Sequence, residues 1–100
     1  MFMPISDDLI KRLMLFGLNK NEAKAYLALL QLKQASASTV AKFSNVPRQE
    51  IYRVLPRLEK LGIVEVIVSK PTKFLAINPE EALSELINYQ QEILANKISE

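Results

Sequence analysis

Apolar residues recur at helical spacing in five parts of the chain, and one β-branched run breaks that rhythm. In each helical part the apolar positions lie three or four residues apart, which is typical of an amphipathic helix with one buried face. The predicted helices cover residues 7–16, 20–33, 37–43, 48–61 and 79–98. The third and fourth are separated by only a short polar turn, so the pattern predicts a helix-turn-helix between Ser36 and Gly62.

The predicted helix boundaries rest on residues that favour helix ends. Side chains that can accept hydrogen bonds from free amides precede four of the helices, at Ser6, Asn19, Ser36 and Asn78. Pro47 suits the start of the fourth helix, because the amide that proline lacks would be unpaired there. Gly17 and Gly62 supply the permissive backbone of a helix C-terminus.

The run Ile63–Val68 is rich in β-branched residues and too short before Pro71 for a typical helix, so we expect a strand. A second strand is expected over Lys73–Ile77, after a cationic turn. A hairpin that follows a helix-turn-helix occupies the place of a wing. The predicted fold is therefore α+β and mostly α, a winged helix-turn-helix with a two-stranded β-hairpin wing and a long C-terminal helix. Residues 1–78 would form the DNA-binding domain and residues 79–100 a dimerisation element of the same domain.

Pro56 lies inside the fourth predicted helix. Proline removes one backbone donor and crowds the carbonyl four residues earlier, at a cost of about 3 kcal/mol in a regular helix. We expect a kink or an early end of the helix between Tyr52 and Leu55.

Composition narrows the class of protein. The chain has 100 residues, 49% of them hydrophobic, and contains neither Cys nor His. Common zinc sites, thiol nucleophiles and imidazole bases are thereby excluded, so we expect neither an enzyme nor a metal or other cofactor. No signal peptide or apolar run of membrane-spanning length is present, so we expect a cytoplasmic protein without a membrane partner.

The charge is distributed unevenly although the net charge is only +2. Between Val40 and Leu75 seven cations face three acids, whereas from Pro79 onward five acids face one cation. A basic middle and an acidic tail favour a single face for a polyanion.

Candidate DNA contacts follow from the helix-turn-helix. The first turns of a second helix usually reach base edges, where Arg can grip guanine and Gln adenine. These positions are Arg48, Gln49, Tyr52 and Arg53. Contacts to the backbone are expected from Ser38, Thr39, Lys42, Lys70 and Lys73, of which the last two belong to the predicted wing. Arg57 and Lys60 are interpreted as solvated cations.

The C-terminal helix is longer than so small a core requires, and we expect its apolar stripe to pair with a second copy of the chain. The predicted dimerisation residues are Leu83, Leu86, Ile87, Gln90, Ile93, Leu94 and Ile98. Packing of this stripe wholly within one monomer is the alternative.

Three segments together resemble the N-terminal domain of TrmB-type archaeal transcriptional regulators. They read FGLNKNEAKAYLALLQL, ASASTVAKFSNVPRQEIYRVLPRLEKLGIVEVI and KPTKFLAINPEEAL, and the resemblance spans Phe16 to Leu83. It implies a winged helix-turn-helix that binds operator DNA as a dimer, with Arg48, Gln49, Tyr52 and Arg53 reading the DNA. The sugar-sensing domain of many members has no counterpart here, so no small-molecule effector is expected within this chain.

The functional hypothesis is a dimeric regulator that binds specific sequences of double-stranded DNA. Its alternatives are an architectural, chromatin-type DNA-binding protein with little sequence preference and a winged-helix interaction module of a transcription assembly. The sequence names neither the operator nor the regulated genes, and it does not distinguish a repressor from an activator.

Overall fold

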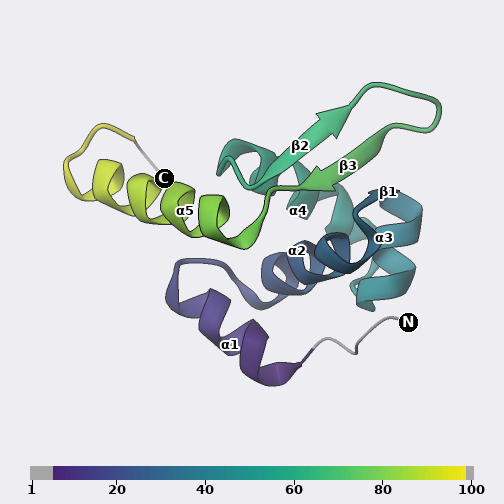
Figure 1. Cartoon of the computed structure of the whole chain (residues 1–100), viewed down its shortest axis with the longest axis horizontal. Coiled ribbons are helices and arrows are strands. Elements are labelled where there is room, and N and C mark those ends of the chain that lie inside the picture. The colour runs from purple at the N-terminus through teal and green to yellow at the C-terminus, as the bar shows by residue number, and fades with distance from the viewer. Residues whose placement is uncertain (1–5, 99–100) are drawn as a thin grey trace.

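The computed structural model describes residues 6–98, and this part of the chain forms five helices and a small sheet (Figure 1). The helices are α1 (Asp7–Leu15), α2 (Lys20–Leu32), α3 (Ala37–Ser44), α4 (Arg48–Lys60) and α5 (Pro79–Leu94). The strands are β1 (Gln34–Ser36), β2 (Val64–Ile67) and β3 (Lys73–Ala76). The predicted α+β winged fold is confirmed, with differences at the sheet and at the last helix.

The predicted caps begin four of the helices. Ser6 Oγ accepts hydrogen bonds from the amides of Asp8 and Leu9 at 3.1 and 3.3 Å. Ser36 and Asn78 accept from amides three residues on, at 3.4 and 3.0 Å. Asn19 forms a full capping box, described with the site below. Each bond satisfies an amide that the helix leaves without a partner.

Three helices end in the same hydrogen-bonded corner, in which a left-handed residue lets two amides reach back to the last carbonyls. Gly17 closes α1 with φ +103°, and Gly62 closes α4 with φ +84°. Asn96 closes α5 with φ 60°, as the amides of Asn96 and Lys97 donate to the carbonyls of Ile93 and Glu92 at 3.0 and 2.8 Å. The prediction that this helix reaches Ile98 was therefore wrong, because asparagine tolerates the left-handed conformation that ends it.

Pro56 does not end α4, which continues to Lys60. Of the two outcomes expected near Tyr52 to Leu55, a kink or an early end, the early end was wrong. The proline ring lies on the exposed side, while Leu55 and Leu58 on either side of it are buried in the core. Burial of these leucines holds the helix together across the missing hydrogen bond.

The sheet has three antiparallel strands in the order β1-β3-β2, not the two predicted. The additional strand β1 connects α2 to α3 and pairs Ser36 with Lys73 and Gln34 with Leu75. On its other side β3 pairs with β2, from Val64 opposite Ala76 to Ile67 opposite Lys73. A three-residue strand carries too little alternation to be seen in a sequence. Its effect is to cover one edge of the hairpin.

The core is built around α2, which packs against α1, α3, α4 and β3. The largest fully buried side chains of the core come from several elements: Tyr26, Leu29, Ile51, Leu55, Leu58, Ile63 and Leu86. The Tyr26 hydroxyl donates to the carbonyl of Ile77, which ties α2 to the junction between β3 and α5. In the described part of the chain, no helix is both long and apolar enough to span a membrane.

Candidate nucleic-acid interface

The first two turns of α4 present the four predicted DNA-reading residues to solvent. Arg48, Gln49, Tyr52 and Arg53 are all exposed, because the buried stripe of this helix runs along the opposite side. Arg48 Nε donates to the Tyr52 hydroxyl at 3.2 Å, and its guanidinium carbon lies 5.9 Å from the centre of the Tyr52 ring. These two contacts hold the Arg48 side chain along the helix, so Arg48 and Tyr52 form one preorganised unit.

The predicted positioning helix is α3, which packs against α4. Thr39 and Lys42 are exposed on it, and Ser38 is half-buried. The Ser36 hydroxyl donates to Thr39 Oγ1 at 3.2 Å in addition to capping the helix. Thr39 is therefore held by a local contact, while Lys42 extends into solvent.

The two predicted wing lysines occupy different environments. Lys70 lies in the exposed turn between β2 and β3, where the Ser69 hydroxyl donates to the Pro71 carbonyl at 2.7 Å. The Lys70–Pro71 peptide bond is cis. Lys73 opens the central strand β3 between Ser36 and Ile67, and it is half-buried. Lys70 is consequently the cation at the wing tip, and Lys73 belongs to the body of the sheet.

A groove of about 360 Å³ brings the three elements together on one side of the molecule. It runs between the start of α3, the exposed face of α4 and the wing. Its lining includes Ser36 and Ser38, then Arg48 and Tyr52, and finally the wing residues Pro71, Thr72 and Phe74. The helix-turn-helix and the wing thus form one continuous surface.

The predicted dimerisation residues separate into two groups on α5. Leu86 is only 2% exposed, and Ile93 and Ile98 pack against the core, so the chain itself covers these three. The other four, Leu83, Ile87, Gln90 and Leu94, follow one another at intervals of four, three and four residues. Ile87 and Leu94 are exposed and Leu83 is half-buried. Gln90 is exposed as well, but its Nε2 donates to the Phe16 carbonyl of the same chain at 3.3 Å. We call these four residues the α5 seam; their spacing is that of a coiled-coil contact line.

Arg57 is not the solvated cation that the sequence suggested. Its side chain is 28% exposed, and its Nε lies 3.7 Å from Glu22 Oε2. Its Nη1 donates to the Tyr89 hydroxyl at 3.4 Å, and its guanidinium carbon lies 5.4 Å from the centre of that ring. Arg57 thus connects α4 to both α2 and α5.

Glu22, which pairs with Arg57, also forms the capping box of α2. Its Oε1 accepts from the Asn19 amide at 2.9 Å, while the Glu22 amide donates to Asn19 Oδ1 at 2.8 Å. The sequence showed this capping box but gave no sign of the contact with Arg57, because the residues involved are more than 30 positions apart and no local pattern links them.

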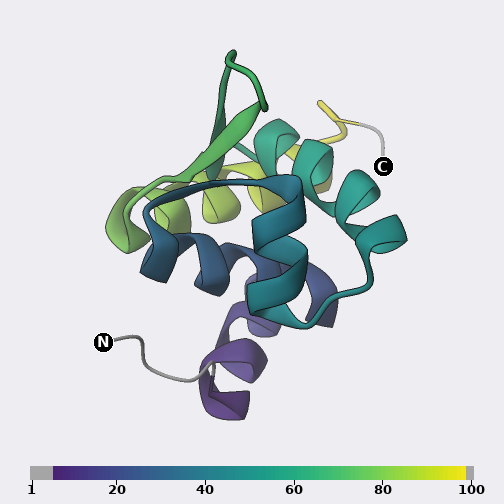
Figure 2. The same ribbon diagram turned by 90° about the vertical axis from the view of Figure 1, so that its right-hand side faces the viewer.

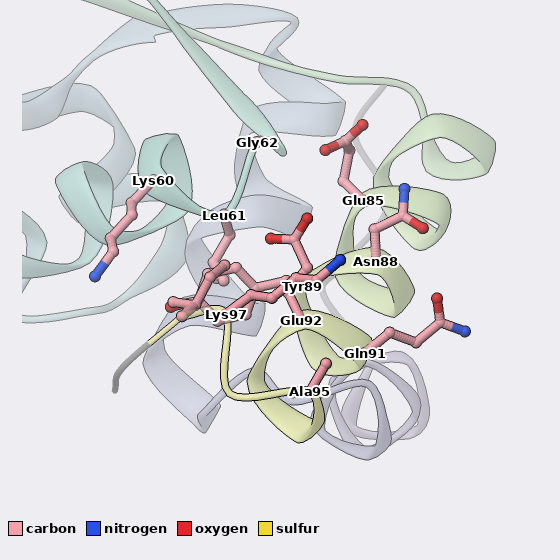
Figure 3. A pocket seen from close by; sticks show the side chains of 11 residues that line it. Lys60, Leu61, Gly62, Glu85, Asn88, Tyr89, Gln91, Glu92, Ala95 and Lys97 are labelled. Carbon is pink, nitrogen blue, oxygen red and sulfur yellow. The ribbon is translucent and has the colours of Figure 1, made fainter.

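The largest cavity described, about 750 Å³, lies between the end of α4 and α5 (Figure 3). Two lysines and two glutamates line it together with amide side chains: Lys60, Glu85, Asn88, Gln91, Glu92 and Lys97. The mixed charges select no single class of ligand. Within residues 6–98, no group of three His, Cys, Asp or Glu side chains could hold a metal ion.

A helix-turn-helix followed by a hairpin, with an exposed basic face on the second helix, defines a winged-helix protein of the nucleic-acid-binding type. Residues 13–80 match the family described as "Sugar-specific transcriptional regulator TrmB". The chain belongs to this family, and the resemblance seen in its sequence is confirmed. The family is described as one of transcriptional regulators, not of enzymes.

Similar proteins have been named in archaea. The chain is 35% identical over 82 residues to the HTH-type sugar sensing transcriptional regulator TrmBL1 of Pyrococcus furiosus. The aligned region covers 82% of this chain and 24% of that relative. The chain is 36% identical over 77 residues to the DNA-binding HTH-type transcriptional repressor TrmBL2 of Thermococcus kodakarensis, covering 77% and 29%. The chain therefore spans about a quarter of the length of these curated relatives.

Solved structures show the same fold. TrmBL2, described as an archaeal chromatin protein with a novel mode of DNA binding, superposes with a TM-score of 0.80 at 32% identity, covering 91% of this chain and 36% of that one. The ST1889 protein of Sulfolobus tokodaii gives a TM-score of 0.63 at 13% identity over 91% and 93% of the two chains. This second likeness concerns the fold alone.

Proposed function

We propose that the chain is a cytoplasmic transcriptional regulator that binds specific sequences of double-stranded DNA as a homodimer. The observation that carries this proposal is the meeting of α3, the exposed face of α4 and the wing around one groove. Arg48 lines this groove, whereas Gln49 and Arg53 do not line it but are exposed on the same two turns of α4. All three offer hydrogen-bond donors to DNA, and Lys70 adds a cation at the wing tip. Membership of a family of transcriptional regulators supports the same function.

In the proposed complex, α4 enters the major groove by its first two turns. Gln49 and Arg53 contact base edges, where a well-placed pair of hydrogen bonds contributes about 1 to 3 kcal/mol of discrimination. Arg48, held beside Tyr52, contacts a phosphate or a base. Ser38, Thr39 and Lys42 on α3, with Lys70 and Lys73 of the wing, would lie against the DNA backbone and fix the register of the protein.

Two copies pair through the α5 seam in this proposal. Leu94 and Ile87 are large apolar side chains that one chain leaves exposed, and apolar surface of this kind favours association. A two-fold dimer predicts a palindromic site whose half-sites lie about 10 bp, or a multiple of that, apart.

Selection of preferred sites from random duplexes at two salt concentrations tests the DNA-binding proposal. Gln49→Ala and Arg53→Ala should relax base preference at one or two positions of the selected site, each by a factor corresponding to about 1 to 3 kcal/mol. Lys11→Ala removes an exposed cation on α1, away from α4 and the wing (Figure 2), and should leave the preference intact. Loss of affinity without a change in preference would contradict base reading by these two residues.

Light scattering tests the dimer. Leu94→Glu places a charge in the α5 seam and should give a monomer. Leu15→Glu is the matched control, because Leu15 on α1 is 85% exposed against 83% for Leu94 but lies outside the seam. Truncation before α5 is a poorer test, since it would also remove Leu86 from the core. A Leu94→Glu protein that remains dimeric would refute the seam.

The likeness to the chromatin protein TrmBL2 supports a second candidate, an architectural protein that coats DNA through backbone contacts. Such a protein would lose affinity evenly over all sequences in the Arg53→Ala variant, and its selected duplexes would share no motif. Absence of duplex binding even at low salt would favour a protein-interaction module instead.

A further inference from the structure

The backbone of α5 lies further from the other helices than theirs lie from one another. The extensive helix contacts join α2 to α1, α3 and α4, and α3 to α4, whereas α5 makes none of comparable extent with another helix. It packs on the core through Ala82, Leu86 and Tyr89, and three of its polar side chains add contacts to neighbouring segments. Gln90 Nε2 donates to the carbonyl of Phe16 at 3.3 Å, Glu85 lies against Gly62, and Tyr89 meets Arg57.

Among these contacts, the one at Arg57 is directional in three ways. The guanidinium lies over the Tyr89 ring, donates to its hydroxyl, and faces the Glu22 carboxylate. Glu22 in turn is fixed by the capping box with Asn19, so it cannot follow Arg57 without uncapping α2. A planar guanidinium bound on two sides admits a narrow range of positions for the ring that it contacts.

A charge pair in such a place is better suited to orientation than to stability. Removing charges from water costs nearly as much as their attraction returns, and apolar side chains of the same size often stabilise a protein equally well. The surrounding positions on α4 and α5 are apolar, since Leu58, Leu61, Leu86 and Ile93 all pack in the core. An apolar residue at position 57 would fit this environment but would not fix the direction of Tyr89.

We infer that Arg57 is a positioning residue that sets the angle between the DNA-reading helix α4 and the dimer helix α5. The inference rests on the proposed function, in which α4 reads the DNA and α5 pairs two copies. A tilt of about 10° over a helix about 24 Å long moves its far end by about 4 Å, which exceeds the roughly 3.4 Å between base pairs. Control of this angle therefore selects the spacing between half-sites, and Arg57 contributes to specificity without touching DNA.

The test is a series of duplexes that carry two selected half-sites at spacings changed by one base pair at a time. The native chain should prefer one spacing by about tenfold over its neighbours, and Arg57→Met should reduce that preference to about threefold or less while affinity for a single half-site stays within about twofold. Lys60→Met is the matched control, because it removes an exposed cation from the same part of α4. An unchanged spacing profile for Arg57→Met would overturn the inference.

Tyr89→Phe provides a milder variant, because it removes the hydroxyl that accepts from Arg57 and keeps the ring in the core. It should shift the spacing profile in the same direction by a smaller factor. A profile equal to that of the native chain would show that the hydroxyl contact does not set the angle.

A measurement without DNA separates this inference from the proposed function. The chain contains no cysteine, so spin labels can be attached at Lys42→Cys on α3 and Gln91→Cys on α5, with labelled protein diluted into an excess of unlabelled protein. The distance distribution should broaden in Arg57→Met and stay narrow in Lys60→Met. If the distribution broadens in Arg57→Met but the native chain shows no preference for a half-site spacing, the specific dimer is refuted and the positioning role is supported. A distribution that stays narrow in Arg57→Met would refute the positioning role itself.

Discussion

Replacement of Tyr26 by phenylalanine should remove a large part of the alkaline sensitivity of the fold. Tyr26 is 2% exposed, and its hydroxyl donates to the carbonyl of Ile77. Burial disfavours the phenolate and raises the pKa of Tyr26 from 10.0 to about 12. The unfolded chain thus loses this proton near pH 10, whereas the folded chain keeps it until about pH 12.

The sign and size of the effect follow from this difference in pKa. Below pH 10 both states hold the proton and the stabilisation is fully present. Between pH 10 and about 12 the unfolded state binds fewer protons, so the free energy of unfolding falls as pH rises. A pKa difference of about two units lowers the free energy of unfolding by about 3 kcal/mol by the end of this window.

Urea unfolding followed by circular dichroism from pH 8 to pH 12 measures the effect. Tyr26→Phe should cost about 1 kcal/mol at pH 8, through the lost hydrogen bond, and should fall less steeply above pH 10 than the native chain. The two proteins share every other titrating group, so the difference between their curves isolates Tyr26. Parallel curves throughout would refute the reasoning, because they would mean that the phenol titrates alike in both states.

Other predictions concern helix ends, the buried acid and the wing. Gly62→Ala should destabilise by about 1 to 2 kcal/mol in urea, because the residue needs φ +84° and a Cβ would lie 2.9 Å from Glu85 Oε2; no loss would contradict this corner. Glu22→Gln keeps the cap but weakens the pair with partly exposed Arg57 and should cost about 1 kcal/mol, whereas Glu22→Ala should cost about 2; equal losses would show that only the pair with Arg57 matters. Lys70→Ala should weaken DNA binding evenly across sequences and lower the salt dependence by about one unit, whereas a change in preferred motif would indicate base contact by the wing.

Local patterns predicted most of the fold because its boundaries are set by neighbouring residues. Ser6, Asn19, Ser36 and Asn78 cap helices through amides two or three positions away, and such contacts are visible in a sequence. The last helix was predicted too long because Asn96 was not recognised as a left-handed corner, a conformation that asparagine only sometimes adopts.

The rest depended on contacts between distant segments. Strand β1 exists because β3 offers it an edge about 40 residues further along the chain, and three residues alone do not favour a strand. The role of Arg57 was missed for the same reason, since Glu22 and Tyr89 come from different helices. Within the candidate site, exposure of Arg48, Gln49, Tyr52 and Arg53 followed from helical periodicity, whereas the groove shared with the wing required the tertiary structure.

Ser36 is the last residue of β1 and also the cap of α3, so no linker separates the sheet from the helix-turn-helix. The same residue pairs with Lys73 on the central strand. Amide protons of β1, β3 and the first turn of α3 should therefore exchange with solvent in one cooperative event, at a common opening free energy. A displacement of the wing is therefore transmitted directly to α3, and the hairpin cannot move independently of that helix.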